Sequence, residues 1–130
     1  MLSKIRAAII WGKMRQRYLN RDFSGAAALA EEYKKTGVTN DVFSTFEATL
    51  DVLNHRSNDA LMKYRKVIDS IKENKGNDKR YIYEYCMSSI KSIEGDPVEA
   101  ESHRKNALRI AASNYVRKSL PLPDRPITEL

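Results

Sequence analysis

Nearly the whole chain carries apolar residues at the three- and four-residue spacing of a helix, and this pattern most constrains its fold. Six stretches show it, and polar turns separate them. Alternation typical of a strand occurs only in YIYEY at 81–85, where Cys86 and Ile90 beyond it restore the four-residue spacing. With only five glycines in 130 residues, long helices are easily accommodated. The sequence therefore predicts an all-α fold.

The six helices pair into three antiparallel hairpins, predicted over residues 3–36, 40–73 and 79–113. Gly37 and Gly95 stand at helix ends, where a left-handed residue is needed. The segment KENKGNDK, 72–79, is predicted to be a polar loop.

The start of the sixth helix has its own local signature. Asp96 can cap it, Pro97 suits its first position, and Glu99 completes a capping box.

The last twelve residues differ from the rest. LPLPDRP, 120–126, cannot be helical because proline lacks the amide that a helix requires. We expect a helical domain over 1–118, followed by an extended proline-rich tail over 119–130. The tail is either disordered or folded over its own last helix, where its apolar residues would cover an exposed edge.

The hairpins are related by an internal repeat. Three alanines, Ala26, Ala60 and Ala100, take equivalent places in the second helices. The first step is 34 residues and the second is 40, and the six extra residues fit within the polar loop at 72–79. The same kind of helix start therefore occurs three times, once in each hairpin.

This pattern resembles the tetratricopeptide repeat family, whose period is 34 residues and whose signature is W-x2-L-G-x2-Y followed by A-x3-F. The matching residues are Trp11, Met14 and Tyr18 in the first repeat, Ala60 and Tyr64 in the second, and Gly95, Asp96, Glu99, Ala100 and Ala107 in the third. Arg15 replaces the signature glycine. The resemblance implies three hairpins stacked as a short right-handed solenoid. An unrelated six-helix bundle is the alternative.

The resemblance also implies a concave groove lined by the first helix of each hairpin. The positions that would face it are Lys13, Gln16, Asn20, Ser44, Thr45, Asp51, Tyr81, Glu84, Tyr85, Ser88 and Lys91. Tyrosines among mixed polar groups suit an extended or helical peptide. The alternative is that Tyr81 and Tyr85 only pack against the loop or a neighbouring helix.

The predicted first helix is strongly basic and has a second apolar stripe. Residues 1–21 hold six basic and no acidic residues, which accounts for the whole net charge of +6. The stripe, Leu2, Ile5 and Ile9, can contact a partner helix, a second copy of the chain or an anionic membrane, or pack deeper into the core.

The basic residues of this helix raise a competing function. Its basic patch, Arg6, Arg15, Arg17 and Arg21, can instead bind phosphates of RNA or DNA.

Enzyme functions find no support in the sequence, since His55 and His103 are isolated and no phosphate loop or nucleophile motif occurs. We expect no catalysis, cofactor or metal. No apolar run is long enough for a transmembrane segment. The single cysteine, Cys86, agrees with the cytoplasm, although an acid-free basic start also fits organelle targeting.

The sequence thus predicts a non-enzymatic adaptor or scaffold that binds a protein or peptide, with a homodimer through the first helix and nucleic-acid binding as alternatives. A toxin antidote or a secretion chaperone would use the same surface.

Overall fold

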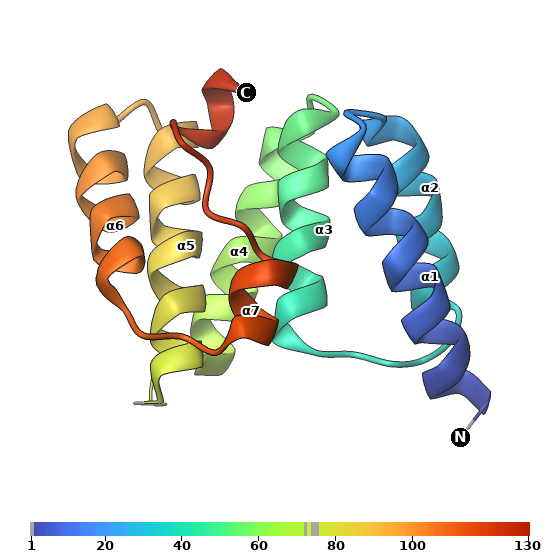
Figure 1. Ribbon diagram of the computed structural model, residues 1–130. Coiled ribbons are helices and arrows are strands. Elements are labelled where there is room, and N and C mark those ends of the chain that lie inside the picture. The colour runs from blue at the N-terminus through green and yellow to red at the C-terminus, as the bar shows by residue number, and fades with distance from the viewer. Residues whose placement is uncertain (1, 72, 74–75) are drawn as a thin grey trace. The chain divides into compact units, whose positions relative to one another are not determined.

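The computed structural model describes residues 2–71, 73 and 76–130 (Figure 1). Its elements are α1 (Leu2–Leu19), α2 (Phe23–Lys34), α3 (Asp41–Leu53), α4 (Ser57–Ile71), α5 (Asn77–Ile93), α6 (Pro97–Arg109), α7 (Asn114–Ser119) and the short 3-10 helix η1 (Ile127–Glu129). None of the described residues lies in a strand. The prediction of an all-α fold is confirmed.

The chain divides into two compact units, Met1–Asn40 and Asp41–Leu130. The first is the hairpin of α1 and α2, in which Met14 and Ala26 are fully buried. The edge of the Trp11 ring meets Tyr33 with the ring centroids 6.0 Å apart. The small residues Ala26 and Ala30 are buried beside these larger side chains, as expected where two helices pack together.

The turn of this hairpin is fixed by a side-chain cap. Asp22 is the N-cap of α2, and its carboxylate accepts the Gly25 amide at 3.0 Å. A Cβ on Gly25 would lie 2.2 Å from that carboxylate, so the cap requires glycine at this position. Arg17 donates to the same carboxylate at 3.1 Å and ties the end of α1 to the start of α2.

The second unit contains two further hairpins, α3–α4 and α5–α6, and α4 also packs against α5. Ala60 and Ala100, equivalent in the predicted repeat to Ala26, are both buried. Phe46 and Cys86, which the repeat aligns with Met14, are buried too. The repeat therefore identified core positions correctly in all three hairpins.

The predicted helix ends agree closely with the structure. Gly37 and Gly95 have φ of +77° and +81°, the left-handed conformation that glycine adopts without strain. Asp96 caps α6 by accepting the Glu99 amide at 3.1 Å, with Pro97 at the first position of the helix. These starts and stops are local signals, and the chain follows them.

The C-terminal part of the chain differs from the prediction in two ways. Helix α5 already begins at Asn77, so the predicted loop at 72–79 is shorter than expected; residues 72, 74 and 75 lie outside the described residues. Asn114–Ser119 form α7, a helix that the sequence did not predict. Residues 120–126 are not helical, as expected, but η1 follows them.

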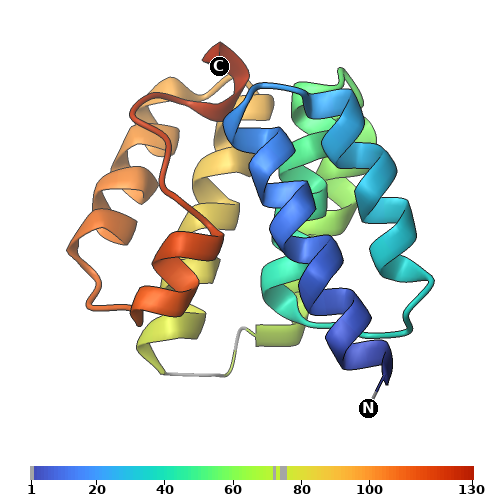
Figure 2. The same cartoon turned by 45° about the vertical axis from the view of Figure 1, so that its right-hand side comes forward.

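Beyond α7 the chain packs against other helices of its own unit, and not against α6 alone. Helix α7 contacts α3, and η1 contacts both α3 and α5. Figures 1 and 2 show this C-terminal segment, residues 120–130, running along these helices between α7 and the C-terminus. The expectation that it folds over the last helix is corrected, because its main contacts are with α3 and α5.

Candidate functional site

An open groove runs between α1 and α2 in the first unit. Its lining residues are Ala8, Ile9, Gly12, Lys13, Gln16 and Arg17 from α1, and Gly25, Ala28 and Leu29 from α2. Four of the nine are glycine or alanine, so the floor is close to helix backbone. A floor of this kind admits a ridge of side chains from another helix. We call this surface the α1–α2 groove.

The predicted second apolar contact leads directly into this groove. Leu2, Ile5 and Ile9 are 83%, 54% and 55% exposed. Together with Gly12 and Gln16 they follow one face of α1 at spacings of three and four. Their exposure rejects the alternative that they pack into the core, and leaves an apolar stripe available to a partner.

Basic side chains surround the stripe, but several are already paired. Arg6 lies 3.7 Å from Glu32, and Arg17 lies 3.1 Å from Asp22. Within the described part of the chain, Lys4 and Lys13 are exposed and have no acidic partner. Lys13, which lines the α1–α2 groove, therefore gives this surface a positive charge with no acidic partner.

The other basic-patch residues are less available. Arg21 lies over the Phe23 ring with its guanidinium carbon 5.5 Å from the centroid, and Arg15 is half-buried. The predicted patch of Arg6, Arg15, Arg17 and Arg21 is thus not a uniform phosphate-binding surface.

The predicted groove residues occur in both units, and their exposure differs between the two. Lys13 and Gln16 line the α1–α2 groove, and Asn20 is exposed in the turn after α1. On α3 and α5 the same prediction fails for most positions. Thr45, Asp51, Tyr81, Tyr85 and Ser88 are at most 9% exposed, so they do not line an open surface.

Internal hydrogen bonds account for that burial. The Tyr85 hydroxyl lies 3.3 Å from the Thr49 hydroxyl, and the Thr45 hydroxyl lies 3.7 Å from the Cys86 sulfur. Ser88 donates to the carbonyl of Ala100 at 2.8 Å, which joins α5 to α6. These polar side chains satisfy each other inside the second unit.

Tyr81 is buried by the C-terminal segment. Its hydroxyl donates to the Leu120 carbonyl at 2.5 Å, and the Arg117 guanidinium lies 5.3 Å from the centre of its ring. Burial raises the pKa of the Tyr81 phenol to about 12, against a smaller opposing effect of Arg117. The predicted groove on α5 would place this hydroxyl in solvent, whereas here it donates to the chain's own backbone.

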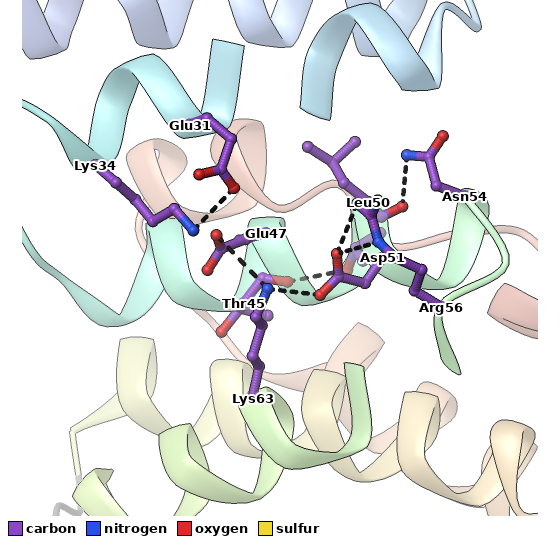
Figure 3. Close-up of polar contacts among 10 residues, drawn as sticks. Glu31, Lys34, Thr45, Glu47, Leu50, Asp51, Asn54, Arg56 and Lys63 are labelled. Atoms are coloured by element: carbon purple, nitrogen blue, oxygen red, sulfur yellow. Dashed lines mark hydrogen bonds and ion pairs between the residues drawn. The ribbon is translucent and has the colours of Figure 1, made fainter. Parts of the chain in front are cut away.

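Asp51 is held by two cations instead of facing a groove (Figure 3). One of its carboxylate oxygens accepts from Arg56 at 3.1 Å, and the other accepts from Lys63 on α4 at 2.7 Å. Glu47, one turn earlier on α3, lies 3.6 Å from the same Lys63. Asp51 therefore connects α3 to the start of α4.

The remaining predicted groove residues have partners or partial exposure. Glu84 accepts from Nδ1 of His103 on α6 at 2.6 Å, in a partly buried pair. Lys91 lies 3.7 Å from Glu94, which also binds Arg65 of α4 at 2.9 Å. Ser44 is half-exposed. None of these positions joins the α1–α2 groove.

Two observations on the described residues bear on catalysis and metal binding. Cys86 is fully buried, and this burial raises the pKa of its thiol to about 12, so it is a poor nucleophile. No group of three or more His, Cys, Asp or Glu side chains among these residues is arranged to hold a metal ion. No helix in the described part of the chain is long and apolar enough to span a membrane.

Sequence reasoning missed the small residues of the α1–α2 groove. Ala8 and Gly12 are four residues apart on α1, and Gly25 and Ala28 are three residues apart on α2. Such pairs of small residues, three or four positions apart on one helix face, were the available signal, because they make the backbone accessible.

A scan against models of known protein families finds no match, and searches of curated proteins and of solved structures find no significant similarity.

Proposed function

We propose that the protein is a non-enzymatic interaction module made of tetratricopeptide-like hairpins, and that it binds a helix of a partner protein in the α1–α2 groove. The repeat register supports the first part, because Ala26, Ala60 and Ala100 are all buried. We propose that the three hairpins stack as a short solenoid, in the cytoplasm, where the unpaired buried Cys86 fits the reducing conditions.

One observation carries the binding proposal: an exposed apolar stripe, Leu2, Ile5 and Ile9, continues into a groove with a glycine and alanine floor. Exposed apolar surface of this kind is typical of interaction sites. A helix supplies apolar anchors at the same three- and four-residue spacing as the stripe.

The charge of this surface favours an acidic partner. Lys13 lines the groove, Lys4 is exposed on the same helix, and residues 2–21 contain no acid. A helix with acidic residues along the edges of its apolar face would complement them. A second copy would bring the same cations into contact, so we propose a hetero-complex in preference to a homodimer.

The test uses the full chain and a variant that fills the groove. Gly12→Gln is suitable because a Cβ at Gly12 meets no atom within 4 Å, and glutamine favours a helix more than glycine does. Val98→Gln is the matched control, since Val98 is 76% exposed on α6, outside the groove. Wild type and both variants are used to capture partners from lysate with and without nuclease, and each captured protein is then purified and titrated.

We expect a purified partner to bind wild type and the Val98→Gln control equally, and Gly12→Gln at least tenfold more weakly. A synthetic helix from that partner should compete. Equal binding by all three chains would reject the α1–α2 groove. Recovery of nucleic acid that is released by salt, with no protein after nuclease treatment, would instead favour phosphate binding by the basic helix.

A further inference from the structure

We propose that the face of α3 and α5 under the C-terminal segment is a second binding site, for a proline-containing peptide that is extended and ends in a short 3-10 turn, and that residues 120–130 are its resident ligand. This site belongs to the second unit and is independent of the α1–α2 groove. Its ligand class is a segment with a leucine and, seven residues later, an isoleucine.

The first reason is that side chains hold the segment by its backbone. The Tyr81 hydroxyl donates to the Leu120 carbonyl at 2.5 Å, and the Arg104 guanidinium donates to the Pro123 carbonyl at 3.2 Å. At the far end, the Ser92 hydroxyl accepts the Thr128 amide at 3.4 Å. In peptide recognition, hydrogen bonds to the ligand backbone can supply affinity, while pockets for its side chains supply specificity.

The second reason is the arrangement of buried and exposed side chains. Leu120 and Ile127 are 0% and 3% exposed, whereas Asp124 and Arg125 between them are exposed. Two anchors separated by a more exposed stretch are typical of a bound peptide. Prolines in that stretch restrict the free segment, so less conformational entropy is lost on binding.

The third reason is that the site needs an occupant. Tyr81 is 1% exposed, and its ring packs beside Tyr85 with centroids 6.4 Å apart. Release of the segment would remove the acceptor of the Tyr81 hydroxyl, which favours replacement by another carbonyl. A partner segment of the same pattern supplies that carbonyl. Replacing the resident segment therefore costs less free energy than leaving the site empty.

The concentration needed for exchange can be estimated. A short linked segment has an effective concentration on the order of millimolar. A free peptide identical to the segment binds the site equally well, so it displaces half of the resident segment when its own concentration reaches this value. Several millimolar peptide should therefore be enough for wild type.

The test uses the full chain and fixes residues 120–130 in place with an engineered disulfide. The Ser92 and Thr128 hydroxyl oxygens are 2.7 Å apart, so Ser92→Cys/Thr128→Cys can form a disulfide, and the one native cysteine is buried. The probe is a fluorescent synthetic peptide that copies residues 119–130. Its binding is compared for the reduced and the oxidised protein, and for an Ile127→Ser variant whose resident segment has lost one anchor. A peptide with serine in place of isoleucine is the control.

We expect the Ile127→Ser chain to bind the peptide at least tenfold more tightly than wild type, and the oxidised lock at least tenfold more weakly than its reduced form. Equal binding by the two redox forms would overturn the proposal. So would the absence of binding to a folded Ile127→Ser chain. If that variant does not fold, wild type decides: several millimolar peptide must speed hydrogen exchange at the Thr128 amide, and no change would overturn the proposal.

Gly12→Gln should leave peptide binding unchanged. Failure of one proposal is therefore distinguishable from failure of the other.

Discussion

Asp51 offers the sharpest test of the polar contacts in the second unit. Its side chain is 5% exposed and pairs with Arg56 and Lys63, whose side chains are 51% and 34% exposed. Asp51→Asn keeps the shape and removes the charge. Losing one member of a buried ion pair destabilises proteins by about 3–5 kcal/mol when the other charge stays buried.

The exposure of the two cations reduces this magnitude. Once the carboxylate is neutral, Arg56 turns to water and Lys63 keeps Glu47 at 3.6 Å, so neither cation is left buried and alone. Three charge-assisted hydrogen bonds are weakened, two from Arg56 and one from Lys63, and a bond of this kind contributes at most about 1.5–3 kcal/mol. We expect Asp51→Asn to lower the free energy of unfolding by about 2–3 kcal/mol.

Substituting the two cations should lower the free energy of unfolding in the order of their burial, with the larger effect at Lys63. Lys63→Met leaves the buried carboxylate with Arg56 alone and should cost about 1–2 kcal/mol, whereas exposed Arg56→Ala should cost less than about 1 kcal/mol. Asp124→Asn is the matched control, because Asp124 pairs with Arg125 while its own side chain is 77% exposed, and it should change stability by less than about 0.5 kcal/mol.

Urea unfolding followed by circular dichroism measures all four variants, with the midpoint compared at constant slope. The double variant Asp51→Asn/Lys63→Met supplies the coupling energy, for which we expect about 1–2 kcal/mol. A change below 0.5 kcal/mol for Asp51→Asn would refute the structural role. A partner-binding defect with unchanged stability would instead support the prediction from sequence that Asp51 lines a binding groove.

Three further predictions concern the core. Ala60→Leu and Ala100→Leu should each overpack a buried contact and cost about 1–3 kcal/mol, whereas exposed Ala28→Leu should not; unchanged melting of the first two would contradict the repeat register. Because burial raises the Tyr81 pKa to about 12, the folded chain keeps a proton that the unfolded chain loses near pH 10. Its contribution to stability is present below pH 10 and lost as pH rises toward 12, and Tyr81→Phe should abolish this dependence; the same slope in both chains would be evidence against it. Cys86 should resist iodoacetamide at pH 8 until urea unfolds the chain, and rapid labelling of the folded protein would disprove its burial.

The helices and their ends could be predicted because their signals are local. The Asp96 cap acts on an amide three residues away, and Gly37 and Gly95 act at their own positions. The repeat register was equally accessible, since Ala26 and its equivalents are small where helices approach. Signals of this kind act within one turn of a helix, so they can be read without knowledge of the tertiary contacts.

Helix α7 was not predictable for the opposite reason. At six residues it is far shorter than a helix that is stable alone. Ser113 caps it, and Asp78, 35 residues earlier, accepts both the Ser113 amide at 2.6 Å and its hydroxyl at 3.0 Å. A contact across that sequence distance leaves no trace in a local pattern.

The two apolar surfaces show why a groove cannot be located from periodicity alone. A helix face that the hairpin does not cover indicates that one more contact is needed, and this holds equally for the Ile5 stripe on α1 and for the predicted groove face of Tyr81 on α5. On α5 the chain itself makes that contact. Residues 120–130, if fully extended, reach roughly 34 Å at about 3.1 Å per residue, while the 17 residues of α5 extend roughly 26 Å at 1.5 Å per residue. The tail is therefore long enough to follow the whole helix, and its Leu120 and Ile127 supply the apolar contact that Tyr81 and its neighbours require. The stripe on α1 stays exposed, and so it is there that a contact from another molecule is expected.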